Sequence, residues 1–296
     1  MKKINLKKNW RFLLFNTLFV LAFFGPLRNL VQMSMSNDTF TYIPFIPIIS
    51  AYLIYEKRQN IFPQERTSSP IGLLAIGIGF LLLFANRNHE AMSYQHDYLT
   101  LMAASMVLIW VGGFTFCYGT RSLLTAVFPL LFLFFMVPFP SNALNKIVLF
   151  LQKGSAEAAY GFFKASGIPV SREGFVFHLM TIDIEIAQEC SGIRSALSLV
   201  ITCVLAANFF LHTSWSRVLL IISTIPITIL KNGFRIAALS MLGVYVDERI
   251  LASDLHKKGG ILFFFIALVL VWVEIVLFRK AEGRLKLKRE VTKEKN

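Results

Sequence analysis

Long apolar runs separated by short polar loops constrain this chain of 296 residues more than any other feature. A run of about 20 apolar residues can cross a bilayer as a helix, and several runs here approach that length. Apolar types make up 55% of the residues, mean hydropathy is +0.61, and only 16% of the residues are charged. The sequence therefore predicts an α-helical polytopic membrane protein, with residues 1–296 forming a single integral membrane domain.

About eight transmembrane helices are expected, and their polar flanks indicate their orientation. The segments that would face the cytoplasm hold 18 of the 30 Lys and Arg residues, whereas the outer loops 31–41 and 86–97 hold only Arg87. By the positive-inside rule both termini are cytoplasmic, and residues 279–296 form a basic cytoplasmic tail. The first run lacks a small-residue cleavage site, so it is predicted to be a retained anchor. The expected spans cover approximately residues 12–30, 42–55, 70–85, 98–118, 122–137, 190–212, 218–236 and 259–278.

Residues 138–188 depart from this pattern because no run there is long enough to cross a bilayer. Apolar residues recur at helical spacing over 142–166, a pattern typical of an amphipathic helix lying on the membrane. The stretches 174–178 and 182–186 favour β-strands, the second by strict alternation. We expect a small extracytoplasmic cap, inserted between spans five and six and made of the amphipathic helix and a β-hairpin.

The sixth expected span begins within the segment ECSGIRS, residues 189–195. Backbone N–H groups and the positive end of a helix favour a thiolate over a thiol, and the thiolate is the nucleophile. Cys190 is therefore a candidate catalytic nucleophile, whereas Cys117 and Cys203 fall inside apolar runs and are typical of packing. There is no CxxC motif and no metal-ligand spacing, so the sequence predicts no disulfide framework, no metal site and no cofactor.

The predicted topology places two further polar groups at the depth of Cys190. The seventh span ascends from Val218, which puts Arg235 roughly 26 Å above it at about 1.5 Å per residue, near the outer boundary. His256 stands just before the eighth span, which descends from the same face. A Cys, an Arg and a His at one level form a workable set for acyl transfer.

Three motifs together carry a family resemblance: CSGIRS at 190–195, NGFR at 232–235 and HKKGG at 256–260. Segments 42–53 and 167–174 support them, and their order at the ends of successive helices is more specific than any motif alone. By these motifs the chain resembles the exosortase/archaeosortase family of membrane cysteine transpeptidases, over about residues 38–278.

The resemblance implies an activity and a set of site residues. Members of that family cut membrane-anchored proteins that carry a C-terminal sorting signal, made of a short Pro-containing motif, a transmembrane helix and a basic tail. They pass the new carboxyl end to an acceptor, in step with surface attachment or polysaccharide export, and plain hydrolysis stays an open alternative. The implied catalytic residues on the extracytoplasmic side of the plasma membrane are Cys190, Arg235 and His256, with Ser191, Gly192, Arg194 and Asn232 as supporting residues.

Two other functions remain open from the sequence. One is a transporter for an anionic solute that uses Lys231, Arg235 and Glu274, although the chain shows no internal repeat. The other is a catalytically inactive scaffold for an export complex. Taken alone, Lys231 is typical of a snorkelling or helix-capping group, and Glu274 is expected to pair with a basic group on a neighbouring helix.

The net charge of +13 does not indicate nucleic acid as a partner. Thirteen of the thirty Lys and Arg residues lie in the first eleven residues or from Arg279 onward, and both clusters adjoin apolar spans. Such placement favours contact with the lipid bilayer and its anionic headgroups over contact with DNA or RNA.

Overall fold

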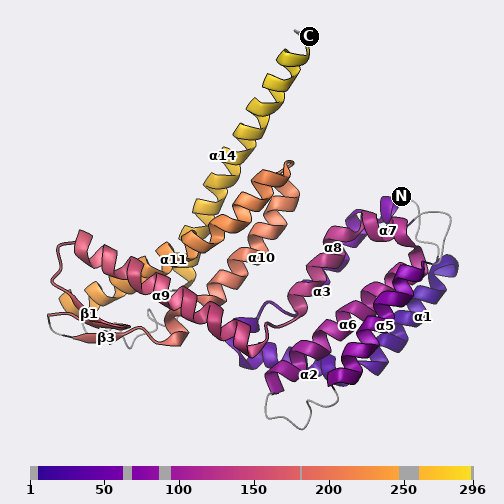
Figure 1. Ribbon diagram of the computed structural model, residues 1–296, viewed down its shortest axis with the longest axis horizontal. Helices are drawn as coiled ribbons and strands as arrows, with labels where there is room; N and C mark the ends of the chain where they lie inside the picture. The colour runs from indigo at the N-terminus through magenta and orange to yellow at the C-terminus, as the bar shows by residue number, and fades with distance from the viewer. Residues whose placement is uncertain (1–5, 63–68, 87–94, 181, 247–259, 295–296) are drawn as a thin grey trace. The chain divides into compact units, whose positions relative to one another are not determined.

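The computed structural model describes residues 6–62, 69–86, 95–180, 182–246 and 260–294, and most of these residues are helical. The chain forms two compact units, Met1–Leu144 and Asn145–Asn296. In Figure 1 the first unit runs from indigo to magenta and the second from pink to yellow.

The first unit is helical, and its longest helix, α6, packs along α5. A hydrogen bond from Trp110 Nε1 to Asn16 Oδ1 (2.9 Å) joins α6 to α1, and one from Ser50 Oγ to Pro129 O (2.8 Å) joins α3 to α8. Cross-helix bonds of this kind satisfy polar groups that lipid cannot solvate. The elements are α1 (Leu6–Ala22), α2 (Phe24–Ser36), η1 (Asp38–Phe40), α3 (Phe45–Glu56), α4 (Arg58–Ile61), α5 (Pro70–Asn86), α6 (Gln95–Tyr118), α7 (Thr120–Thr125), α8 (Val127–Phe132) and η3 (Leu133–Met136).

Helices α5 and α6 approach so closely that two glycines meet between them. A Cβ at Gly112 would lie 2.8 Å from the Gly72 carbonyl oxygen, and a Cβ at Gly72 would lie 2.8 Å from the Gly112 carbonyl oxygen. Small residues at a helix crossing let backbones come together and increase the van der Waals contact that drives association in lipid. The two glycines therefore set the distance between α5 and α6.

Four helices among the described residues are long and apolar enough to cross a membrane, or up to six if each bent pair counts as one span. The chain is thus a helical multi-pass membrane protein, while the expected count of eight is not confirmed. The first expected span is bent by 67° between Ala22 and Phe24. Pro26 explains the bend, because its ring clashes with the carbonyl four residues earlier and it has no N–H to donate.

Three other expected spans are shorter than a bilayer or are broken. Helix α3 has 12 residues and α5 has 17, which correspond to about 18 Å and about 26 Å. The fifth expected span is divided into α7, α8 and η3. Length and hydropathy of the sequence do not reveal such breaks.

Over its described residues, the second unit contains four α-helices and a small sheet. Strands β1, β2 and β3 form one antiparallel sheet in that order, with Phe177 paired to Arg172 on one side and to Ile184 on the other. The elements are α9 (Ser141–Ala165), β1 (Ser171–Glu173), β2 (Val176–His178), β3 (Asp183–Glu185), η4 (Gln188–Ser191), α10 (Ile193–Phe210), α11 (Ser214–Tyr245) and α14 (Gly260–Glu294).

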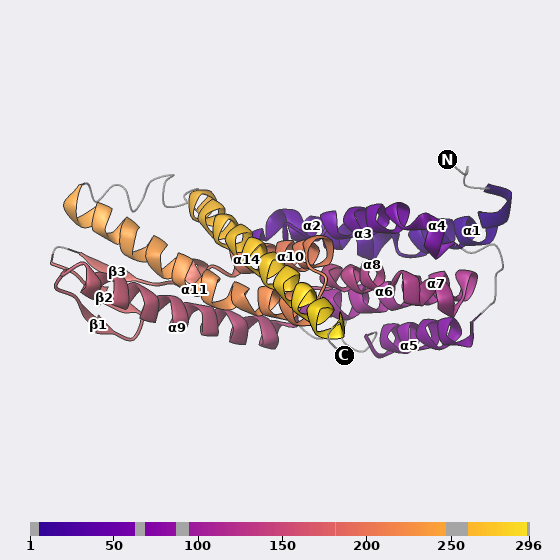
Figure 2. The same cartoon turned by 90° about the horizontal axis from the view of Figure 1, so that it is seen from above.

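The sheet lies along α9, as Figure 2 shows, and shares a core with it. Phe177 and Ile186 are buried against Ala159 and Phe163 of α9 and Ala237 of α11. The expected helix over 142–166 therefore corresponds to α9, and the expected hairpin corresponds to β2 and β3 with β1 added at its edge. That these residues form an extracytoplasmic cap stays a prediction.

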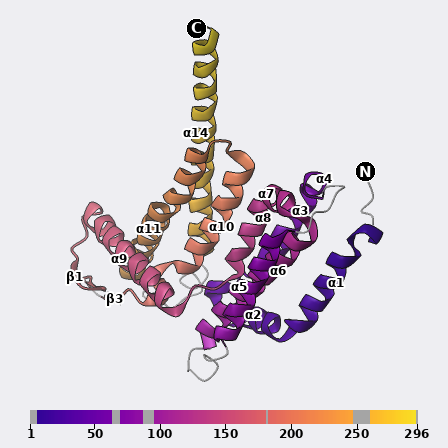
Figure 3. The same ribbon diagram turned by 45° about the vertical axis from the view of Figure 1, so that its right-hand side comes forward.

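Helices α10, α11 and α14 run side by side, as Figures 1 and 3 show. Their contact is apolar and includes Leu199 and Cys203 of α10, Leu220 of α11, and Ala267 and Val271 of α14. Helix α14 continues through the basic segment that follows the eighth expected span, so residues 279–294 are helical.

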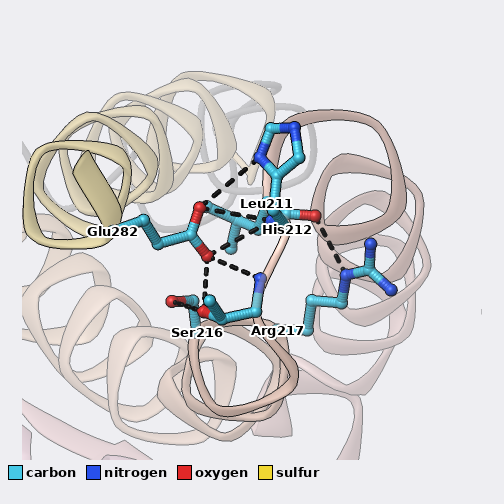
Figure 4. A network of polar contacts seen from close by, with 6 residues as sticks. Leu211, His212, Ser216, Arg217 and Glu282 are labelled. Atoms are coloured by element: carbon cyan, nitrogen blue, oxygen red, sulfur yellow. Dashed lines mark hydrogen bonds and ion pairs between the residues drawn. The ribbon is translucent and has the colours of Figure 1, made fainter. Parts of the chain in front are cut away.

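A buried carboxylate in this part of α14 holds the turn between α10 and α11 (Figure 4). Glu282 accepts hydrogen bonds from Thr213 N (2.8 Å), Thr213 Oγ1 (2.5 Å) and His212 N (3.2 Å). These N–H groups lie at the start of α11, where helical donors have no partner within the helix and a negative charge is favourable. Glu282 therefore caps α11 from a different helix.

Replacing Gly112 with Leu is expected to weaken the α5–α6 contact. The new Cβ meets the Gly72 carbonyl, and overpacking of this kind costs about 1–3 kcal/mol. Gly77→Leu is the matched control, because a Cβ at Gly77 meets nothing within 4 Å. Thermal unfolding of the detergent-solubilised protein should show a lower midpoint for Gly112→Leu alone, and equal midpoints for the two variants would contradict the close crossing.

Replacing Glu282 with Gln is expected to destabilise the α10–α11 turn. The charge is lost, and an amide N–H₂ takes the place of one acceptor oxygen beside His212 N and Thr213 N. Hydrogen bonds to a charged group are worth about 1.5–3 kcal/mol, so we expect a loss of about 2 kcal/mol. Thermal unfolding measures this loss, and Glu185→Gln on the exposed edge of β3 should leave the midpoint unchanged.

Candidate functional site

Cys190 lies in the turn that leads into α10. It is part of η4, and its N–H donates to the Ala187 carbonyl over 3.0 Å. Gly192 follows with φ +81°, and α10 begins at Ile193. The half-buried Cys190 therefore lies just ahead of the N-terminus of α10.

Asn232 on α11 holds this turn in place. Its Nδ2 donates to the Cys190 carbonyl (2.7 Å) and to Ser155 Oγ on α9 (3.0 Å). Asn232 is 1% exposed and Ser155 is fully buried. An unpaired amide at such a position would lose its interaction with water without compensation, so both bonds contribute to stability. One side chain thus joins α9, η4 and α11.

Gly192 is required in this turn for two reasons. Its φ of +81° is unfavourable for residues with a Cβ. A Cβ at Gly192 would also lie 3.0 Å from Asn232 Cγ and 3.1 Å from Asn232 Oδ1. The turn after Cys190 therefore depends on both the backbone of residue 192 and the position of Asn232.

Arg235 lies three residues beyond Asn232 on α11, one helical turn nearer its C-terminal end. It is half-buried, and it interacts electrostatically with Cys190. The structure thus brings Cys190 together with two residues of α11, Asn232 and Arg235, that follow it by more than 40 positions in the sequence. His256 lies outside the described residues, so its convergence with them stays a prediction.

Lys231 differs from the expectation that it snorkels or caps a helix. It is 8% exposed, and its Nζ donates to Ser195 Oγ over 2.5 Å. Ser195 in turn donates to the Gly192 carbonyl over 2.9 Å. The ammonium group therefore contacts the first turn of α10 instead of reaching for water.

Helix α9 supplies polar groups that sequence reasoning missed. Gln152 Nε2 donates to the Ile186 carbonyl (2.7 Å), which anchors the segment between β3 and η4. The backbones of α9 and α11 approach closely here, since a Cβ at Gly233 would lie 2.9 Å from Ala159 N. Gln152 and Ser155 lie on the same face of α9 as Ala159. Two polar residues on an otherwise apolar face were the feature of the sequence that could have identified them as part of the site.

The other supporting residues occupy different environments. Ser191 is fully buried, and among the described residues neither its Oγ nor Asn232 Oδ1 has a hydrogen-bond partner. Arg194 is exposed in the first turn of α10. Ser191 therefore faces the interior of the unit, whereas Arg194 faces its surface.

Glu274, expected to pair with a basic group, is instead bonded to a hydroxyl. Ser223 Oγ on α11 donates to Glu274 Oε2 over 2.6 Å. Ser223 precedes Lys231 by eight residues, about 12 Å along the helix. Over the described parts of the chain, no group of three or more His, Cys, Asp or Glu residues is arranged to hold a metal ion.

Replacing Asn232 with Leu tests whether this amide fixes the Cys190 turn. Leu has a similar size but leaves the Cys190 carbonyl and Ser155 Oγ without their donor, at a cost of about 1–3 kcal/mol for each buried group left unpaired. We expect a lower thermal midpoint and an altered rate of Cys190 alkylation in a Cys117→Ala/Cys203→Ala background. Asn145→Leu, at an exposed position of α9, is the control. Unchanged midpoint and alkylation in Asn232→Leu would contradict the anchoring role.

Comparison with known families identifies a match that covers most of the chain. The family model described as Transmembrane exosortase matches residues 33–273, which is well over half of the chain. The matched region contains Cys190, Asn232, Arg235 and His256. Comparisons with curated proteins and with solved structures find no match.

Proposed function

We propose, from the premise that this chain belongs to the transmembrane exosortase family, that it is a membrane-embedded cysteine protease and transpeptidase. Its substrates are membrane-anchored proteins with a C-terminal sorting signal, which it cleaves next to the transmembrane segment of that signal. The site lies on the extracytoplasmic side of the plasma membrane, and both termini are cytoplasmic. The observation that carries this proposal is the position of Cys190, whose carbonyl is bonded by Asn232 and whose thiol interacts with the charge of Arg235 on the same helix.

The proposed reaction has two halves. Cys190 Sγ attacks the carbonyl carbon of the scissile amide while His256 accepts the thiol proton. Collapse of the tetrahedral intermediate breaks the C–N bond, and His256 returns the proton to the leaving amine. An acceptor amine, or water, then attacks the thioester, which regenerates the thiol and releases the new amide or acid.

Arg235 stabilises the negative charge that develops on the carbonyl oxygen in this mechanism. A single donor to such an oxyanion is typically worth about 3 kcal/mol, or more than a hundredfold in rate. The charge interaction between Arg235 and Cys190 supports this role, because the substrate carbonyl must lie beside the sulfur. Gly192 leaves room for the substrate backbone to approach the turn.

The alternative of an anion transporter is less well supported by the geometry. Its three residues would have to line one path, yet Lys231 is buried against Ser195. Glu274 is bonded to Ser223, about two helical turns away from Lys231 along α11. An inactive scaffold would place no demand on the Cys190 turn, whereas hydrogen bonds from Asn232 and Ser195 hold it.

Cys190→Ala and Cys190→Ser should both abolish cleavage, because neither side chain supplies a thiolate. Loss of a catalytic nucleophile lowers kcat by more than about 10³-fold. The measurement is co-expression with a test protein carrying the three-part C-terminal signal, followed by detection of the shortened product. A thioester trapped on Cys190 and identified by mass spectrometry would locate the cut.

Cys117→Ala and Cys203→Ala are the matched controls, because these thiols lie in the apolar helices α6 and α10. Both variants should retain cleavage. A Cys190→Ala protein that still shortens the test substrate would contradict the proposed function.

A further inference from the structure

Two consecutive residues of α11 hold the two peptide carbonyls on either side of Ser191. Asn232 donates directly to the Cys190 carbonyl (2.7 Å). Lys231 acts through Ser195, whose hydroxyl accepts from Nζ (2.5 Å) and donates to the Gly192 carbonyl (2.9 Å). The turn that carries the thiol is therefore held at both ends by one helix.

The Gly192 carbonyl is also where α10 begins. It accepts the N–H of Ala196 over 2.9 Å, which is the first hydrogen bond of that helix. The Ser195 hydroxyl gives this carbonyl a second donor, and the Lys231 ammonium polarises that hydroxyl. Hydrogen bonds in a chain of this kind strengthen one another, most of all where the surroundings exclude water.

The buried position of Lys231 is energetically unfavourable for a charged side chain. An ammonium group is costly to remove from water unless it finds hydrogen-bond acceptors or an opposite charge. Lys231 is 8% exposed, and Arg235 on the next turn of the same face adds a second cation nearby. A methionine would fill the same volume without this cost, so a specific role accounts better for the lysine.

We propose that Lys231 is a positioning residue, which acts through Ser195 to fix the Gly192 turn and so holds the Cys190 thiol in place beside Arg235. The proposal rests on the proposed function for its effect on catalysis. The relay itself, from Lys231 to Ser195 to the Gly192 carbonyl, is a statement about structure and can be tested without substrate.

The test uses the full chain reconstituted in lipid vesicles and compares Lys231→Met, Ser195→Ala and the double variant. Hydrogen–deuterium exchange of peptides covering residues 188–196 reports the turn, and kcat and KM for the test substrate report catalysis. Lys231→Arg retains a cationic donor and serves as the conservative variant. Lys153→Met, at an exposed position of α9, is the control for loss of a lysine.

Both single variants should speed amide exchange in the turn and lower kcat by about tenfold, with KM changed less than twofold. Residues that act through one relay are non-additive, so the double variant should be no worse than either single variant. Lys231→Arg should recover most of the activity. If Lys231→Met does not fold, Ser195→Ala still tests the second half of the relay.

Three results would overturn the proposal. The first is unchanged amide exchange of the turn in both single variants, and the second is a change in KM with kcat unaffected. The third is a roughly hundredfold loss of kcat in the double variant, equal to the product of the two single losses, which would show that the residues act independently. Failure of the proposed function looks different. The wild-type protein and Cys190→Ala would then both leave the substrate uncut, while amide exchange would still report whether Lys231 and Ser195 hold the turn.

Discussion

The hydrogen bond from the Asn232 amide to the Cys190 carbonyl is the contact on which the arrangement of the candidate site depends. Asn232 is almost fully buried and also bonds to Ser155, so α9, η4 and α11 meet at one side chain. Where water and lipid cannot supply a hydrogen-bond partner, a polar group without one costs several kcal/mol. Helix arrangements that break the bonds of Asn232 are therefore disfavoured. The position of the thiol therefore follows from the packing of helices and not from the short segment that carries it.

The same helix, α11, is joined to α14 at two levels by carboxylates. Ser223 donates to Glu274, and Thr213 and His212 donate to Glu282. The two glutamates are eight residues apart, or about 12 Å along α14. Between them lie the apolar contacts of Leu220 with α10 and α14. The helix that presents Lys231, Asn232 and Arg235 is thus fixed over its first half, which limits how far its second half can shift relative to α10.

The sequence predicted elements with a strong period and missed those set by distant contacts. Helical spacing over 142–166 located α9 to within one residue at each end, and strict alternation over 182–186 located β3. Strand β1 was missed because Ser171, Arg172 and Glu173 are all polar and show no alternation. The division of the fifth expected span left no hydropathy signal. Helix arithmetic brought Arg235 to the level of Cys190. The contacts of Gln152, Ser155 and Ser195 depend on which helix faces meet, and the periodicity of a single segment does not reveal that. Lys231 was expected to snorkel or to cap a helix, and the sequence did not reveal its acceptor, Ser195 Oγ, because that residue belongs to another helix.

Two independent constraints favour glycine at position 192, directly after the Cys190–Ser191 pair. Its positive φ excludes most side chains by backbone strain, and Asn232 excludes them again by contact. Removing the contact with Asn232 does not remove the backbone strain at position 192. A smaller residue at 232 would leave space for a side chain at 192, but it would also remove the hydrogen bond to the Cys190 carbonyl. The glycine, the amide and the thiol therefore act as one unit, since each is needed for the position of the next, and a change at any of the three reaches the sulfur.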